Sequence, residues 1–488
     1  MSSSSPSELL LEGRRRWIAL NVLCLGMLMI VFDSTIVNVA LPSIRADLGF
    51  SESSLAWLVN AYLLAYGGFL LLGGRMGDLY GPRTVFIIGT AIFTLASLAC
   101  GAATSLALLI IARAMQGVGG AVVSAVTLSL ILNMFSDQEE RAKALGVTGL
   151  VCSGGGSIGV LLGGLLTSTL SWHWIFFVNL PVGVAVCFLC LYLIPGKSES
   201  SSGERLDIAG AITVTTALML GVYVILNGHN AGWTSKQSVG PLSVAVGLFL
   251  IFLIIESRVR APLVPLSLFR SRAISVSNIV AVLWATGLFS WGFTAALYLQ
   301  RILGYDSLHV ALVFLPANVV MAVLALCLSA KLVIRFGVNA PLAIGLLLCA
   351  LGLALFTTAR LNATLLSDVY PGMLLLGIGT GIASNPLLIA STSGVDSSKS
   401  GLVSGLVNTS SMMGGAVGLA ILASAASAHT AHLLRQGIPE MAALNAGYHL
   451  AFAMGSVACT VAAILSITLL PSGKRGEVQL EEGVGTTQ

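Results

Sequence analysis

Two charged side chains interrupt long apolar runs of this sequence, and their chemistry could carry a proton. Asp33 lies in MLMIVFDSTIVNVALP, residues 27–42, and Arg113 lies in LIIARAMQGVGGA, residues 109–121. A charge at the centre of a bilayer costs about 2.5 kcal/mol or more, so such a residue is a functional candidate. Burial disfavours the charged form of a carboxyl group. Asp33 could therefore bind and release a proton whose presence Arg113 senses.

The depth of the two residues predicts that they meet. Asp33 lies about 24 Å along the apolar segment 17–40, and Arg113 lies about 10 Å into segment 106–133, at a rise of about 1.5 Å per residue. Because the two segments are expected to run in opposite directions, both residues fall in the outer half of a ~30 Å hydrocarbon core. A structural ion pair that only locks two helices is the alternative, since buried pairs often add little stability. By helical spacing, the face of Arg113 also carries Gln116, Gly117, Gly120 and Ser124.

The elements that must position these residues are membrane spans. Of the 488 residues, 56% are hydrophobic and 9% are charged, whereas soluble domains carry about 25% charged residues. Apolar runs of about 20 residues, the length that crosses a ~30 Å core, recur from end to end. Since lipid cannot satisfy backbone polar groups, these runs predict an all-α polytopic membrane protein. Fourteen spans are expected, near residues 17–40, 54–73, 84–103, 106–133, 144–167, 174–195, 206–228, 239–256, 273–298, 309–334, 338–358, 366–390, 400–427 and 446–470.

The distribution of basic residues predicts the orientation. With the N-terminus inside, eighteen of the 24 Lys and Arg residues fall in cytoplasmic segments, five fall in outer loops, and Arg113 falls in a span. This bias follows the positive-inside rule, and adding or removing one span would destroy it. We therefore expect a multi-pass protein of the cell membrane, the bacterial inner or plasma membrane, with both termini cytoplasmic.

Motifs for catalysis and cofactor binding do not occur in the sequence. It contains no GxxxxGKS or GxxxxGKT loop and no HExxH, and PGKS at 195–198 lacks the leading glycine. Cys187 and Cys190 form a CxxC without a polar third ligand, so we expect no metal. The net charge of +4 follows from the topology and offers no basic patch for nucleic acid. We expect a monomer in the lipid bilayer that is not an enzyme, uses no cofactor or ATP, and acts on a small molecule and protons.

A weak internal repeat divides the chain into halves. GRMGDLYG at 74–81 and AKLVIRFG at 330–337 agree in their basic, apolar, aromatic and glycine positions at an offset of 256 residues. Chance is the alternative explanation, because short basic turns with glycine are frequent in cytoplasmic loops. Transporters are often built from such repeats. The prediction is a six-helix half at 1–195, two inserted helices with a cytoplasmic linker at 196–272, and a second six-helix half at 273–488.

Glycines in the fifth predicted span indicate close helix packing. Gly155, Gly159 and Gly163 recur every four residues in GLVCSGGGSIGVLLGG, and Gly164 follows them. Small residues at this spacing let two helix backbones approach closely. Helix packing alone explains the pattern. For function, it indicates only a close contact between two helices that could slide along each other.

Several segments together resemble the major facilitator superfamily. RMGDLYGPR at 75–83 is similar to the signature loop, LIIARAMQGVGGA to the buried-arginine motif, and GVLLGG at 159–164 to the antiporter motif. FDSTIVNVALP, SWHWIFFVNLPVG, RAPLVPLSLFR and SGLVNTSSMMGGAVGLA resemble segments of its fourteen-span drug:proton antiporter family. The resemblance covers almost the whole chain. It implies the major facilitator fold, with two six-helix halves plus two inserted helices.

The resemblance also implies roles for matched positions. Asp33 would be the proton-accepting acid and Arg113 its basic partner. Three charged residues would form a cytoplasmic cluster that latches the two halves together: Arg75, Asp78 and Arg83. This sequence departs from the family at Val160, where the antiporter motif usually has proline, and this departure weakens the inference of exchange direction.

The expected function is proton-coupled export of bulky amphipathic compounds, such as drugs, antibiotics or similar metabolites, by alternating access. The substrate cavity should lie between the halves near the midplane. Its candidate lining residues are Asn60, Tyr62, Tyr66, Trp284, Trp291 and Asn318. Tyr and Trp residues in spans are also common at membrane interfaces. The alternative for the four aromatic candidates is therefore a position at the interface instead of in the cavity. Two other classes stay open: a proton-coupled importer of a small nutrient, and a non-transporting membrane sensor or scaffold.

Overall fold

The computed structural model describes residues 6–49, 52–135, 137–194, 206–259, 262–393 and 397–471, and these residues form helices joined by short connections. Fourteen helical segments in this part of the chain are long and apolar enough to cross a membrane, which confirms the predicted number. Helices suit continuous apolar runs because each backbone group is paired within its own segment.

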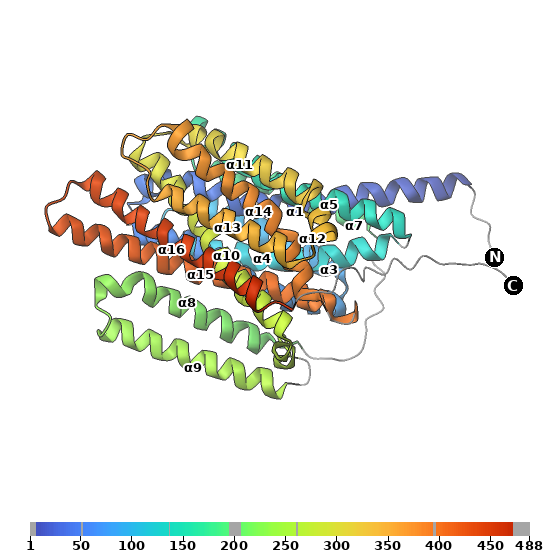
Figure 1. The fold of residues 1–488 in the computed structure, drawn as a ribbon. Helices are drawn as coiled ribbons and strands as arrows, with labels where there is room; N and C mark the ends of the chain where they lie inside the picture. The colour runs from blue at the N-terminus through green and yellow to red at the C-terminus, as the bar shows by residue number, and fades with distance from the viewer. Residues whose placement is uncertain are drawn as a thin grey trace.

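Seven helices form the first half, and two more form the inserted hairpin. The first half comprises α1 (Pro6–Leu48), α2 (Glu52–Tyr80), α3 (Pro82–Gly101), α4 (Leu106–Met134), α5 (Gln138–Thr169), α6 (Trp174–Phe177) and α7 (Asn179–Leu193). The hairpin comprises α8 (Ile208–Ala231) and α9 (Lys236–Arg258). Figure 1 shows α8 and α9 side by side at one flank of the bundle. There α8 packs against both α2 and α15, so the hairpin touches both halves.

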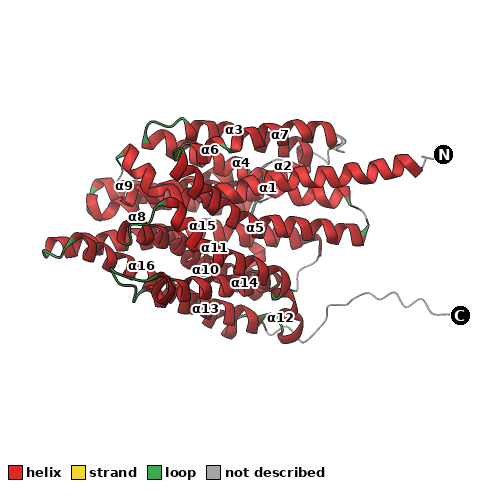
Figure 2. Cartoon of the chain, turned by 90° about the horizontal axis from the view of Figure 1, so that it is seen from above, coloured by secondary structure: helices red, strands yellow, loops and turns green. Residues whose placement is uncertain are grey.

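The second half follows a short 3₁₀ helix, η1 (Leu266–Arg270). Its elements are α10 (Arg272–Leu297), the π-helical turn η2 (Tyr298–Ile302), α11 (Ser307–Cys327), α12 (Ser329–Phe336), α13 (Asn339–Phe356), the π-helical turn η3 (Leu365–Val369), α14 (Tyr370–Thr392), α15 (Ser397–Arg435) and α16 (Glu440–Thr468). Figure 2 shows α3 and α7 at one side of the molecule and α12 and α13 at the other. The halves meet where α5 packs against α11 and where α2 packs against α15.

Each segment of the predicted repeat ends in a glycine with a positive φ angle. Gly81 separates α2 from α3 with a φ of 87°, and Gly337 follows α12 with a φ of 77°. Only glycine adopts this region without strain, so both positions need it for a sharp turn. Pro82, with its fixed φ, then begins α3 at the first helical position. The equivalent glycines support an internal repeat at this offset.

Two predicted spans are interrupted in the structure. The span expected at 309–334 ends at Cys327, and α12 is a separate short helix. Lys331 and Arg335 lie one turn apart and give α12 an exposed, charged face, which favours a position at the surface. The span expected at 174–195 is divided into α6 and α7 by Val178. The predicted division at 195/196 and the two chain ends lie outside the described residues. The division at 272/273 falls at the start of α10.

Candidate functional site

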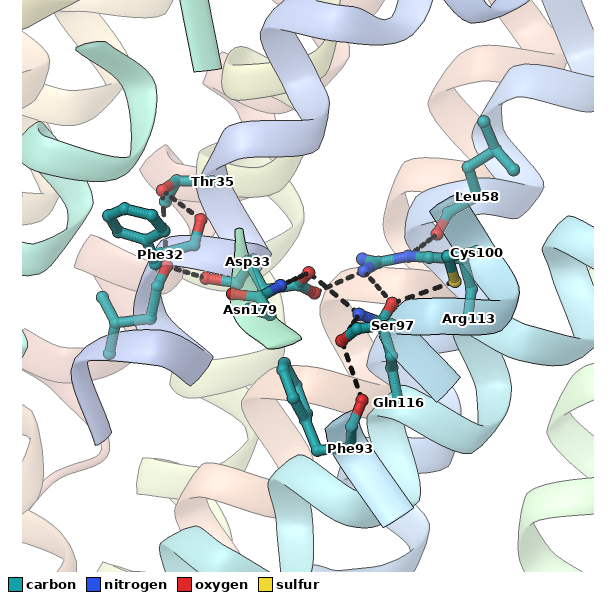
Figure 3. A network of polar contacts seen from close by, with 12 residues as sticks. Phe32, Asp33, Thr35, Leu58, Phe93, Ser97, Cys100, Arg113, Gln116 and Asn179 are labelled. Atoms are coloured by element: carbon teal, nitrogen blue, oxygen red, sulfur yellow. Dashed lines mark hydrogen bonds and ion pairs between the residues drawn. The ribbon is translucent and has the colours of Figure 1, made fainter. Parts of the chain in front are cut away.

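The Asp33 carboxyl group is enclosed by side chains from two other helices. Asp33 lies on α1 with none of its surface exposed, and its Oδ2 forms an ion pair with Arg113 of α4. Its Oδ1 accepts hydrogen bonds from Gln116 Nε2 at 3.0 Å and from Asn179 Nδ2, on α7, at 3.2 Å. Figure 3 shows these side chains converging on the carboxylate. Such partners are required, since an isolated buried charge is strongly disfavoured.

Arg113 has further partners besides Asp33. Its Nε donates to the carbonyl oxygen of Leu58 at 3.1 Å, and its Nη1 donates to Gln116 Oε1 at 2.8 Å. The guanidinium carbon lies 4.4 Å from the centroid of the Tyr62 ring, within the range of a cation–π contact. All three of these groups are uncharged. They can therefore hold the guanidinium in place when Asp33 is protonated.

Gln116 connects the ion pair to α3. Its Nε2 donates to Ser97 Oγ at 2.7 Å, and Cys100 Sγ donates to its Oε1 at 3.3 Å. The sequence placed Gln116 on the face of Arg113 but did not single out Ser97 or Asn179. The asparagine inside the apolar stretch IFFVNLPVG was a usable signal. Ser97 offered none, because a serine in a helix commonly bonds only its own backbone.

The α5 glycines bring the α1 backbone close to α5 beside Asp33. Gly155, Gly159 and Gly163 all face α1. A Cβ atom at Gly159 would lie 2.9 Å from the carbonyl oxygen of Phe32, and one at Gly163 would lie 2.9 Å from that of Ile36. These distances are too short for any side chain, so glycine is required for this approach.

The next residue of α5 faces the other half of the molecule. A Cβ atom at Gly164 would lie 2.6 Å from the carbonyl oxygen of Ser307, at the start of α11. Consecutive glycines therefore let α5 contact α1 with one residue and α11 with the next.

A cavity lies between the two halves, on the side of α1 away from Asp33. Its empty volume, which includes the space at its opening to solvent, is about 780 Å³. Side chains of α1, α5, α10 and α11 form most of the wall, together with one residue of α2. In Figure 3, Thr35 of this wall lies on the opposite side of α1 from the Asp33 carboxylate.

Two of the six expected cavity residues, Trp291 and Asn318, line this cavity. The other four lie elsewhere in this structure. Tyr62 is buried against Arg113, with its ring centroid 5.9 Å from that of Tyr66, because the cation attracts the aromatic face. Asn60 is fully buried on α2. Trp284 packs against two apolar clusters, one shared by both halves and one within the second half, and lies nearly two helical turns before Trp291.

Comparison with known proteins identifies the family of this chain. The family model described as Major Facilitator Superfamily matches residues 23–419. The chain belongs to the Major Facilitator Superfamily. It is similar to the puromycin resistance protein of Streptomyces alboniger, with 35% identity over 94% of this chain and 92% of that protein. It is also similar to the cephamycin export protein of Amycolatopsis lactamdurans, with 37% identity over 83% of this chain and 84% of that protein.

This chain has the same fold as a solved transporter structure. The nucleoside transporter NupG superposes with a TM-score of 0.67 and 10% identity, covering 93% of this chain and 100% of that one. Together with the fourteen apolar helices, the family match establishes a multi-pass membrane protein. The chain is a transporter of small molecules and not an enzyme.

The superfamily's signature loop spans the turn between α2 and α3. Arg83 donates from Nη2 to the carbonyl oxygen of Leu191 on α7, at 2.5 Å, a contact within the first half. Arg75 and Asp78, in the last two turns of α2, also interact with other groups. The latch role of the cytoplasmic cluster of Arg75, Asp78 and Arg83 stays a prediction.

Proposed function

We propose that this chain is a proton-coupled secondary exporter of bulky amphipathic compounds, such as drugs, antibiotics or similar metabolites, that works by alternating access. The names of two similar proteins, a puromycin resistance protein and a cephamycin export protein, support transport out of the cell and support antibiotics as the class of substrate. The proton gradient drives export without ATP or a cofactor. The protein acts as a monomer in the cell membrane with both termini in the cytoplasm, and the cytoplasmic cluster acts as its latch.

The observation that carries this proposal is the fully buried Asp33 carboxylate paired with Arg113. When a proton binds Asp33, the ion pair is lost, and Leu58, Gln116 and Tyr62 keep Arg113 in place. The contact between α1 and α4 is then weaker, so the equilibrium between two arrangements of the helices shifts.

The proton gradient is large enough for this work. One charge crossing the membrane contributes about 2.3 kcal/mol per 100 mV. One pH unit adds about 1.4 kcal/mol. The sum of about 3.7 kcal/mol per proton supports a concentration ratio of a few hundredfold, at about 1.4 kcal/mol per factor of ten.

Drug tolerance and proton release together test the proposal. An efflux-deficient bacterial host that makes the full chain should tolerate more of at least one compound in a panel of amphipathic antibiotics. That compound should then release lumenal protons from energised inverted vesicles that contain a pH-sensitive dye. The matched sample carries Asp33→Asn and should show neither effect.

The two alternative classes give different results in the same experiments. An importer would make cells accumulate its substrate and grow more sensitive to a toxic analogue of it. A sensor or scaffold would produce no dye response with any compound of the panel. Either result would overturn the export proposal.

A further inference from the structure

The cavity between the halves has an uncharged wall. None of the described residues that line it carries a charge: they are Ser34, Thr35, Asn38, Val39, Val59, Val160, Leu288, Phe289, Trp291, Gly292, Ala296, Phe314, Asn318 and Met321. A charged substrate would lose its hydration there without meeting an opposite charge, which is strongly disfavoured. The wall therefore selects against ionic compounds.

Three polar groups of this wall lack a partner inside the protein. Trp291 is 5% exposed, and its Nε1–H is buried without an acceptor. The amides of Asn38 and Asn318 make no hydrogen bond with any other described residue, although Asn318 is only 9% exposed. Buried polar groups are normally paired. The two amides are therefore available to a ligand in the cavity, and the indole N–H, which can only donate, becomes available after a small movement of the side chains that cover it.

The same wall offers aromatic surface next to these polar groups. The rings of Trp291 and Phe314 lie with their centroids 5.3 Å apart, and Phe289 also borders the cavity. Aromatic rings prefer to pack against other planar apolar groups. The combination fits a molecule with a flat apolar body and at least one hydrogen-bond acceptor, such as a carbonyl oxygen.

Asp33 does not belong to this wall. By the geometry of 3.6 residues per turn, Ser34, Thr35 and Asn38 centre about 150° around α1 from Asp33. The Asp33 carboxylate is enclosed by Arg113 and has no exposed surface. A substrate in the cavity cannot touch this carboxylate in this conformation.

We propose that the cavity binds uncharged, flat, amphipathic compounds that carry a hydrogen-bond acceptor, and that proton and substrate occupy separate sites on opposite faces of α1. Trp291, Asn38 and Asn318 determine this specificity. The inference rests on the proposed function for its transport context. The two sites communicate through the movement of α1 and not through competition for one carboxylate.

Two dyes with the same ring system test the choice of substrate. Nile red is neutral and carries a carbonyl group, whereas Nile blue is a cation on the same benzophenoxazine ring. Binding is measured by fluorescence titration of the purified full chain in lipid nanodiscs, with empty nanodiscs subtracted. We expect Nile red to bind at least about tenfold more tightly than Nile blue. Equal or tighter binding of Nile blue would overturn the proposal.

Variants of the wall test the residues that are held responsible. Trp291→Phe keeps an aromatic ring but removes the donor, so Nile red should bind about fivefold more weakly, the effect of one neutral hydrogen bond. Trp174→Phe changes an exposed tryptophan that does not line the cavity and should leave the affinity unchanged. Asn38→Asp places a charge in the wall and should shift the preference toward Nile blue. An unchanged preference in Asn38→Asp would contradict the assignment.

An Asp33 variant tests whether the proton site and the substrate site are separate. Asp33→Asn that elutes as folded protein in nanodiscs should still bind Nile red with an affinity within a few-fold of the parent, whereas a shared site would lose the dye; Asp33→Asn with Arg113→Gln, which removes the unpaired charge, should bind the dye as well. A chain that binds Nile red selectively but releases no protons would refute proton-coupled export and leave the binding inference standing. Proton-coupled export together with tighter binding of Nile blue would refute the binding inference and leave the proposed function standing.

Discussion

Gln300 and Ser307 donate hydrogen bonds to the same atom, the carbonyl oxygen of Val39. Gln300 Nε2, in η2, lies 2.9 Å from this oxygen, and Ser307 Oγ, at the start of α11, lies 3.1 Å from it. Val39 belongs to α1 and also lines the cavity. Two residues of the second half thus hold the first half at one end of the cavity, which in the proposed orientation is the outer end.

Removing both hydrogen-bond donors, Gln300 and Ser307, should make the outer end of the cavity open more often. A single variant, Gln300→Leu or Ser307→Ala, leaves the carbonyl with one donor, so its effect should be small. The double variant removes both hydrogen bonds that join this carbonyl oxygen to the second half. Opening should therefore rise by more than the product of the two single effects. The measurement is the rate at which a membrane-impermeant maleimide labels a cysteine introduced at Asn38 from outside the cell.

The parent that lacks the introduced cysteine corrects for labelling of the native thiols. Effects of the two single variants that simply multiply in the double variant would mean that the two donors act independently. In that case the shared acceptor would not hold the closed state.

Asp33→Asn should abolish coupling and also destabilise the fold. The amide cannot bind or release a proton, and it leaves the Arg113 charge buried without its counter-ion, which costs about 3 kcal/mol or more. Adding Arg113→Gln removes that charge and should restore much of the thermal stability in detergent without restoring lumenal proton release. A double variant that regained proton release would place the coupling group elsewhere.

Asp306 supplies the control for this experiment. It caps α11 and lies outside the membrane-spanning helices, and hydrogen bonds from the backbone N–H and ring of His309 lower the pKa of its carboxyl group. A lowered pKa keeps Asp306 charged at neutral pH, and its capping contribution is lost only as the pH falls through that lowered value. Asp306→Asn should therefore leave the dye response of the vesicles intact.

Arg113→Lys should retain only part of the coupling. A lysine can face Asp33, but it cannot also donate to Leu58 and Gln116 with a planar fork. The ammonium group is then held less well when Asp33 is protonated. We expect proton release to slow by about tenfold while substrate still binds, with the rate taken from the vesicle dye and the affinity from titration. Normal release rates would show that a point charge is sufficient.

Gly159→Ala should destabilise the contact between α1 and α5. The new Cβ would lie 2.9 Å from the carbonyl oxygen of Phe32, and such overpacking costs roughly 1–3 kcal/mol. Gly156→Ala, on the same helix, gains the same helix propensity, but its nearest contact is an ordinary 3.8 Å to Thr35. The first variant should unfold at a lower temperature in detergent than the second. Equal unfolding temperatures would mean that α1 can move away without cost.

The sequence by itself determined the membrane architecture. Composition and apolar run length decide that the chain crosses the bilayer as helices, because lipid offers no hydrogen bonds to the backbone. The same physics marked Asp33 and Arg113, since a charge in an apolar run is costly and therefore conspicuous. Helical spacing placed Gln116 beside Arg113, and the spacing of the α5 glycines indicated a close helix contact before its partner was known.

Only the tertiary structure decided which surfaces face each other. Tyr62 and Trp291 are both aromatic residues in spans, yet one packs on Arg113 and the other lines the cavity. This difference depends on the rotation of α2 and α10 against helices distant in the sequence, and local periodicity does not contain that information. The same reason applies to Asn179 and to the shared acceptor on Val39. The side of α1 that faces the cavity was likewise decided by packing, because α1 is apolar around most of its circumference.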